Sequence, residues 1–79
     1  MMTPTQCKMA RVALGWTLQD LADAAQVGLA TVNRFETQQA VPRRATLAAI
    51  QRALEAAGIE FLPGGGVRPR EQPAGASAS

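Results

Sequence analysis

The 79-residue chain contains no histidine and only one cysteine, Cys7. Without histidine it has neither an imidazole for acid–base catalysis nor a histidine ligand for zinc. A single cysteine excludes an internal disulfide and a set of thiolate metal ligands. The sequence therefore predicts no metal site and no cofactor.

Long apolar runs are also lacking. No stretch approaches the roughly 20 residues that span a bilayer, and the N-terminus does not have the pattern of a secretory signal peptide. We therefore expect a cytoplasmic protein with no membrane partner.

Arrangements typical of catalytic sites are missing as well. The glycines at 64–66 have neither the spacing nor the following helix of a phosphate-binding loop. The acidic residues are spread around predicted helices and form no evident carboxylate pair. These are Asp20, Asp23, Glu36, Glu55 and Glu60. We expect no catalytic residues and no enzyme activity.

The chain is rich in small apolar residues. Apolar residues make up 47% of it, which argues against global disorder, and alanine dominates them, which favours closely packed helices. The length allows one domain. A net charge of +2 is mildly basic and does not by itself identify a nucleic-acid partner.

The most informative stretch is 17–36, which predicts two short helices joined by a tight turn. Thr17 has the place of an N-cap, and Asp20 three residues later completes a capping box. Leu18, Leu21, Ala22 and Ala25 then recur with helical spacing. The run 26–28 interrupts this face, and Thr31, Val32 and Phe35 resume it. The outward face of the second helix would carry Leu29, Ala30, Asn33, Arg34 and Thr37. This is the layout of a helix-turn-helix.

The wider pattern resembles the lambda-repressor-like, Cro-type (XRE-type) DNA-binding domains over roughly 6–62. The resemblance depends on the joint spacing of residues that are individually common. They are Arg11, Gly15-Trp16-Thr17, Leu21-Ala22, Val27, Thr31-Val32, Arg34, Glu36, Pro42 and Thr46-Leu47.

We predict an all-α fold, a compact four-helix bundle with a central helix-turn-helix, over residues 3–62. Thr3 and Pro4 begin the first helix, which Gly15 ends. A fourth helix spans about 43–57, with its core face at Thr46, Leu47, Ile50, Ala53, Leu54 and Ala57. A short strand follows at 59–62, and residues 67–68 either form a second strand or stay loose. We expect Met1 and Met2 to be loose and the Gly/Pro-rich tail 63–79 to be disordered.

Two residues of the first helix need separate interpretation. The resemblance implies an ion pair between Arg11 and Glu36 that ties the first helix to the third; the alternative is two solvated charges. Cys7 is interpreted as a small buried apolar residue, with a reactive thiol as the alternative.

The resemblance implies that the second helix of the motif lies in the major groove of double-stranded DNA. Asn33 can pair with adenine and Arg34 with guanine or phosphate, while Leu29 and Ala30 can contact thymine methyl groups. The predicted DNA-binding residues are Thr17, Gln19, Gly28, Leu29, Ala30, Asn33, Arg34, Gln38, Arg43 and Arg44.

Arg43 and Arg44 support DNA binding on physical grounds. They begin a helix, where the dipole disfavours cations by about 0.3–1 kcal/mol each. Phosphate contact would explain this choice, and two solvated charges are the alternative.

Four positions depart from the family pattern, at Leu18, Gln26, Gly28 and Gln38. Leu18 replaces a phosphate-contacting glutamine, Gln26 and Gln38 replace glycines, and Gly28 replaces a serine cap. A left-handed Gln26 would cost about 1–2 kcal/mol. The reading surface is therefore poor in hydrogen-bonding groups, and it remains open whether the domain reads few bases, reads shape or binds a protein.

Proteins of this type usually bind as dimers, with recognition helices about 34 Å apart. The predicted dimerisation residues are Ile59, Phe61 and Leu62, in a strand that could pair with its twin; alternatively, Phe61 folds back onto the first and fourth helices. We expect a homodimeric transcriptional regulator, a repressor more than an activator, on an inverted-repeat operator. The alternative is a protein-interaction module, an antitoxin-like or adaptor subunit.

Overall fold

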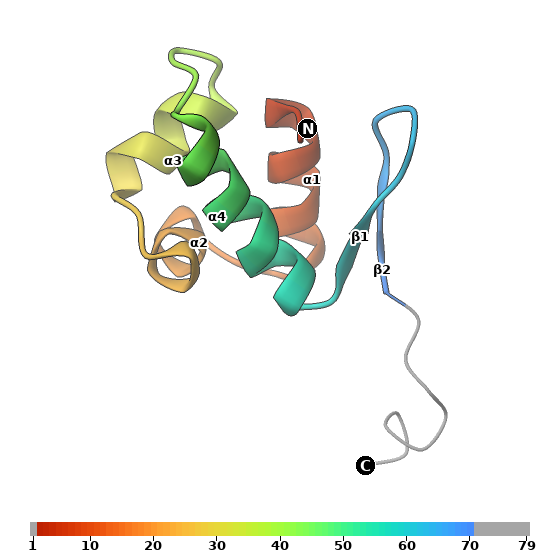
Figure 1. Cartoon of the computed structure of the whole chain (residues 1–79). Helices are drawn as coiled ribbons and strands as arrows, with labels where there is room; N and C mark the ends of the chain where they lie inside the picture. The colour runs from red at the N-terminus through yellow and green to blue at the C-terminus, as the bar shows by residue number, and fades with distance from the viewer. Residues whose placement is uncertain (1, 71–79) are drawn as a thin grey trace.

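A computed structural model describes residues 2–70 of the chain. Its elements are α1 (Pro4–Ala13), α2 (Leu18–Ala25), α3 (Leu29–Glu36), α4 (Arg44–Ala56), β1 (Ile59–Phe61) and β2 (Val67–Pro69). Figure 1 shows the helices gathered into one bundle, with the two strands as a hairpin along one side. The predicted four-helix fold with a central helix-turn-helix is confirmed.

The first two helices begin with complete capping boxes. The hydroxyl of Thr3 accepts from the amide of Gln6 at 3.1 Å, and the Gln6 side chain accepts from the amide of Thr3 at 2.9 Å. At α2, the Thr17 hydroxyl accepts from the Asp20 amide at 3.0 Å and an Asp20 oxygen accepts from the Thr17 amide at 2.8 Å. Each box pairs two amides that the start of a helix leaves free.

The chain turns between helices through left-handed residues. Gly15 follows α1 with φ of 71°, a conformation that costs glycine little. Gln26 ends α2 with φ of 58° and ψ of 45°, so the left-handed conformation considered from the sequence is present on a residue with a Cβ.

The core lies between the four helices. Its largest fully buried side chains are Leu21, Ile50, Leu54, Ile59, Val32 and Cys7. Of the predicted core face of α4, Leu47, Ile50 and Leu54 are buried, Thr46 and Ala53 are partly buried, and Ala57 is exposed. The prediction for Ala57 is wrong: this residue is the C-cap that follows Ala56, and at this end of the helix its side chain opens to solvent.

The C-terminal part of the domain is a hairpin and not a lone strand. β1 and β2 pair antiparallel, with Phe61 opposite Val67 and Glu60 opposite Arg68. Of the two alternatives for residues 67–68, the second strand is the one present, and it spans Val67–Pro69. The remainder of the predicted disordered tail, 71–79, lies outside the described residues, as does Met1.

Contacts with α1 hold the hairpin in place. The buried side chain of Gln6 donates to the carbonyl oxygen of Gly66 at 3.2 Å, which joins the first turn of α1 to the hairpin turn. Met2, expected to be loose, is only 5% exposed and belongs to the core cluster. Neither contact could be read from local sequence, because each joins the N-terminus to a distant part of the fold.

Candidate DNA-binding surface

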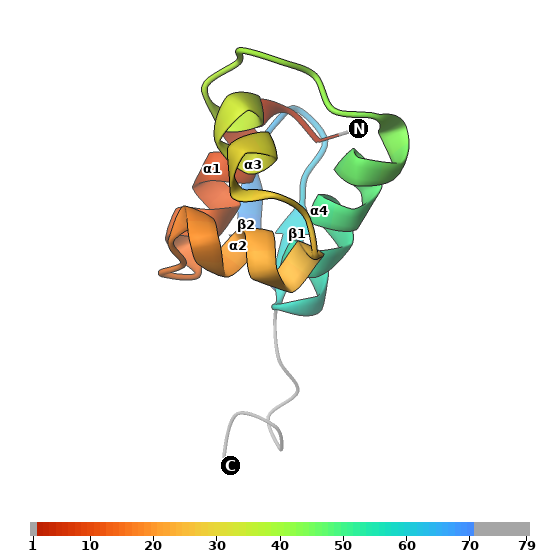
Figure 2. The same ribbon diagram turned by 90° about the vertical axis from the view of Figure 1, so that its left-hand side faces the viewer.

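The helix α3 has one buried and one open face. Val32 and Phe35 are 0% and 3% exposed and point into the core. Ala30, Asn33 and Arg34 are exposed on the other side. Figure 2, turned by 90° from Figure 1, shows α2 and α3 in front of the hairpin. The outward face predicted for α3 is therefore free to meet a large partner.

The polar groups on this face remain available. The C-terminal turn of α3 is closed by Thr37, whose hydroxyl donates to the main-chain oxygen of Asn33 at 2.7 Å. Among residues 2–70, the side chains of Asn33 and Arg34 form no hydrogen bond with the protein. Both can therefore form hydrogen bonds with a ligand without breaking one inside the domain.

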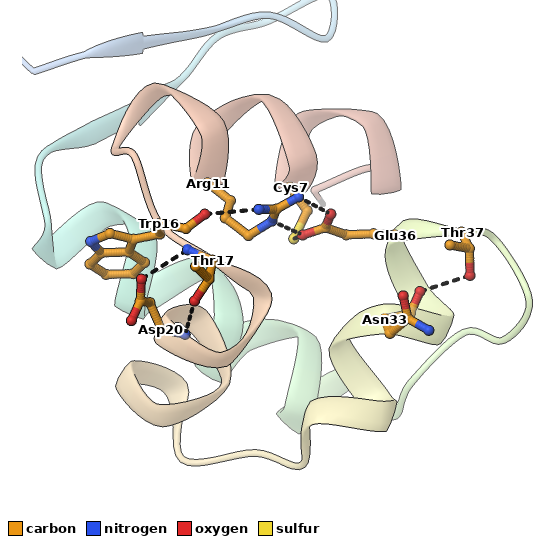
Figure 3. A network of polar contacts seen from close by, with 8 residues as sticks. All are labelled: Cys7, Arg11, Trp16, Thr17, Asp20, Asn33, Glu36 and Thr37. Atoms are coloured by element: carbon orange, nitrogen blue, oxygen red, sulfur yellow. Dashed lines mark hydrogen bonds and ion pairs between the residues drawn. The ribbon is translucent and has the colours of Figure 1, made fainter.

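Arg11 and Glu36 form a buried ion pair that fixes α3 against α1 (Figure 3). The guanidinium donates to both carboxylate oxygens, from Nε at 2.9 Å and from Nη2 at 3.0 Å. Nη1 donates to the carbonyl oxygen of Trp16 at 2.8 Å. The side chains are 14% and 4% exposed, so the solvated alternative does not describe them. The pair fixes the end of α3 relative to α1 and to the main chain before α2.

The thiol of Cys7 lies beside the same carboxylate. Its sulfur donates to Oε2 of Glu36 over 3.6 Å. Burial, together with the negative charge of Glu36, raises the pKa of the Cys7 thiol to about 12. Thiols react as thiolates, so a residue this far from ionisation is a packing residue at neutral pH.

The N-terminus of α4 differs from those of α1 and α2. Its N-cap is Arg43, which makes no side-chain capping bond, and its first turn has no acidic residue. Arg43 and Arg44 are exposed there. The free amides and two cations form an electropositive end that suits a phosphate group.

The comparison with known proteins agrees with this geometry. Residues 8–61 match the family model HTH_3, described as helix-turn-helix. The chain belongs to the HTH_3 family. The resemblance to XRE-type domains is thereby confirmed, and the protein is a DNA-binding transcription regulator of the XRE type. No curated protein matches the chain in a sequence search.

HTH_3 domains are DNA-binding regulatory modules and not enzymes. Within residues 2–70 no group of histidine, cysteine, aspartate and glutamate side chains could hold a metal ion. None of the helices in this region is long and apolar enough to cross a membrane.

The start of α2 is less open than the sequence suggests. The Thr17 hydroxyl is occupied as an N-cap, and Gln19 donates to a carboxylate oxygen of Asp23 at 2.8 Å. Asp20 in the first turn of α2 and Asp23 one turn further on are both exposed, and their charges would repel a phosphate. A contact from Gln19 requires its side chain to leave Asp23, whereas the Thr17 hydroxyl, which accepts from the Asp20 amide, still has a proton to donate.

Two other members of the predicted DNA-binding set lie at the ends of α3. Gly28 is its N-cap and provides no side-chain bond. A Cβ at this position would meet only the Thr31 hydroxyl, at 3.7 Å, so glycine is not demanded by packing. Gln38 follows α3 in the left-handed conformation, with φ of 61°, and is exposed.

Two of the three residues predicted to mediate dimerisation pack against the core of the monomer. Ile59 is 1% exposed, and Phe61 packs against the core together with Val67. The fold-back expected as an alternative for Phe61 is therefore the arrangement present. Leu62, the residue after β1, is half-buried. Because successive side chains of a strand point to opposite faces, it lies on the face opposite to that of Phe61.

Sequence reasoning missed an apolar groove on α1. It has a volume of about 610 Å³ and includes Met9, Val12 and Gln38 in its lining. Met9 and Val12 are 38% and 59% exposed. Their i, i+3 spacing on the outward side of α1 is the signal that could have identified it.

Proposed function

We propose that this HTH_3 protein is a sequence-specific repressor that binds an inverted-repeat operator as a homodimer. The observation that carries the proposal is the open face of α3, where Asn33 and Arg34 are exposed and make no hydrogen bond within residues 2–70. A helix with such a face fits the major groove, whose base edges it can contact.

Direct readout would come from two polar side chains. Asn33 can form two hydrogen bonds with adenine, and Arg34 can do the same with guanine. Ala30 lies one turn before them on the exposed face and is short enough to let the helix approach the bases closely. Each good contact contributes about 1–3 kcal/mol of discrimination between bases.

Positioning on the duplex would come from α4. Arg43 and Arg44 extend from a helix start that has no side-chain cap. Contacts to phosphate fix the register of a protein on DNA but carry no direct base information. The exposed main chain at Gly28 is a further contact of this kind.

We infer a dimer because one half-site is too short to provide many contacts to a single recognition helix. A single recognition helix reads a few base pairs, and a two-fold dimer doubles the contacts on an inverted repeat. Because Ile59 and Phe61 are engaged in the monomer, Leu62 is the member of the predicted set that we assign to the contact between copies. Repression would follow from occupancy, because a protein on the operator excludes others from it.

The test is a selection of the purified protein against fragmented genomic DNA from its own source, near physiological salt. An enriched inverted repeat, with half-sites one helical turn apart, is the expected result. Arg43→Ala should then weaken binding to all sequences alike, whereas Asn33→Ala should relax specificity at one position of each half-site. If a folded protein enriches no sequence, the proposal is wrong.

A protein-interaction module is the second candidate function. The exposed Leu29, next to Ala30, and the apolar groove on α1 favour it. The salt dependence of DNA binding separates the two functions. A phosphate-binding dimer weakens steeply as salt rises, whereas an adaptor binds DNA weakly at every salt concentration.

A further inference from the structure

The apolar groove on α1 runs along the whole of that helix. Its lining there consists of two rows of residues spaced four apart, Pro4, Lys8 and Val12 in one row and Thr5, Met9 and Ala13 in the other. The rows extend over all 10 residues of α1, which corresponds to a length of about 15 Å. The facing wall comes from the end of α3 and the turn after it, at Glu36 and Gln38. A groove of this length between rows of side chains has the shape that accepts another helix.

Two large apolar side chains open into this groove. Met9 and Val12 are 38% and 59% exposed, and neither belongs to the core cluster or packs against it. The stability of the domain therefore does not explain them. Apolar side chains one helical turn apart are the contacts that a helix makes when it lies in a groove.

The groove presents one free charge to a partner. Of its two charged residues, Glu36 is buried and bound by Arg11. Lys8 is exposed and forms no ion pair or side-chain hydrogen bond within residues 2–70. A positive charge beside an apolar floor is complemented by an acidic side chain on an apolar helix face.

Gln38 occupies a position that favours glycine. Its φ is 61°, a conformation that glycine adopts without strain. Its side chain lines the groove and forms no hydrogen bond within residues 2–70, so the amide is free to bind a partner. Gln38 is also the one member of the predicted DNA-binding set in the lining, because Asn33 and Arg34 lie outside it.

We propose that the groove on α1 binds an amphipathic helix of a partner protein. Two apolar residues of that helix, one turn apart, cover Met9 and Val12, and an acidic residue beside them pairs with Lys8. The inference does not require α3 to bind DNA, since the open face of α3 lies outside the groove.

Two other occupants fit less well. The outward face of α1 carries Lys8 and no acidic residue, so a two-fold contact between α1 helices of two copies would bring like charges together. The segment 71–79 of the chain contains no apolar residue larger than proline, and such small side chains bury little apolar area over Met9 and Val12.

The probe is a phage-displayed library of helical peptides about four turns long, randomised at the apolar and charged positions of one face. The full-length protein should enrich helices that carry two large apolar residues at i and i+3 or i+4, with an acidic residue beside them. An enriched peptide, titrated by fluorescence anisotropy, should bind Val12→Ala about tenfold more weakly, because two methyl-sized groups are no longer buried. Lys8→Glu should weaken binding about fivefold and should instead enrich helices with a basic residue in that place.

Val41→Ala is the matched control, because Val41 is an exposed apolar residue outside the groove. It should bind the peptide as the wild type does. If the wild type enriches no helix, if Val12→Ala binds as tightly as Val41→Ala, or if Lys8→Glu also enriches acidic helices, the inference is wrong. If Val12→Glu dissociates the full-length dimer, a second copy occupies the groove, which also overturns the inference. The proposed function is tested separately, by the operator selection.

Discussion

At the scale of single residues, Glu36 links the position of α3 to the stability of the fold. It is the last residue of α3, and its carboxylate is held by Arg11 from α1 and by the thiol of Cys7. Arg11 in turn holds the main chain of Trp16, just before α2. The carboxylate therefore joins α1 to α3, and Arg11 extends the network to the residue before the N-cap of α2.

Glu36→Ala should lower the free energy of unfolding by about 3–5 kcal/mol, because it leaves the buried guanidinium without its counter-charge. Glu55→Ala is the matched control. Glu55 accepts one bond from Gln51 on the surface of α4, at 3.2 Å, and its loss should cost about 0.5 kcal/mol or less. Thermal unfolding measures both, and equal melting temperatures would contradict the prediction.

Cys7 should make stability fall at high pH. The folded thiol has a pKa of about 12, against an ordinary value of 9.0. Above pH 9 the unfolded chain loses this proton while the folded protein keeps it, so the unfolded state is favoured progressively until about pH 12.

The comparison is between the wild type and Cys7→Ala, in urea unfolding at pH 8, 9 and 10. The stability advantage of the wild type should be constant below pH 9 and shrink above it, by roughly 1 kcal/mol per pH unit. Other groups that titrate in this range cancel in the difference. A difference that stays constant up to pH 10 would show that the thiol ionises normally.

At the scale of elements, the helices differ in whether side chains form hydrogen bonds with the free amides of their first turns. α1 and α2 complete their first turns with their own side chains, whereas α3 and α4 begin at Gly28 and Arg43 without a side-chain bond. The two helices that we assign to DNA are those whose first amides remain available. The turn between α2 and α3 carries strain instead, at Gln26.

Gln26→Gly should raise the free energy of unfolding by about 1 kcal/mol, because glycine adopts the left-handed conformation without a Cβ clash. Gln39→Gly is the control, since Gln39 is exposed and does not have a positive φ. It should leave stability unchanged or lower it through the added freedom of the unfolded chain. Urea unfolding decides, and equal effects at the two positions would rule out strain at Gln26.

At the scale of the whole molecule, the hairpin decides which surfaces a second copy can reach. It places Ile59, Phe61 and Val67 against the helices and leaves Glu60 and Arg68 on the outer side, paired at 2.9 Å. Within residues 2–70 the exposed large apolar side chains are Met9 and Val12 on α1, Leu29 on α3 and Val41 before α4. Leu62, beside the hairpin turn, is half-buried.

Sedimentation equilibrium of the full chain should give twice the monomer mass of 8.3 kDa. Leu62→Glu should return the protein to a monomer and weaken operator binding, because it buries a charge at the proposed contact. Val12→Glu places the same charge on α1 and should leave the dimer intact. The reverse pattern would move the contact to the groove on α1.

The sequence by itself determined the local features of this protein. The capping boxes at Thr3 and Thr17, the left-handed turns and the inward face of α3 depend on residues within a few positions of one another. Their chemistry is therefore visible along the chain. The outward residues of α3 follow from the same helical period, once Val32 and Phe35 mark the buried side.

Only the tertiary structure decided features that join distant segments. The pairing of 59–61 with 67–69, the burial of Met2, the bond from Gln6 to Gly66 and the groove on α1 all depend on how elements pack. A three-residue strand has no periodicity long enough to show which face is buried. The apolar residues of such a strand could pack against a partner or against the core. In the structure the hairpin packs against α1 and α4, with Ile59 in the core and Phe61 against it.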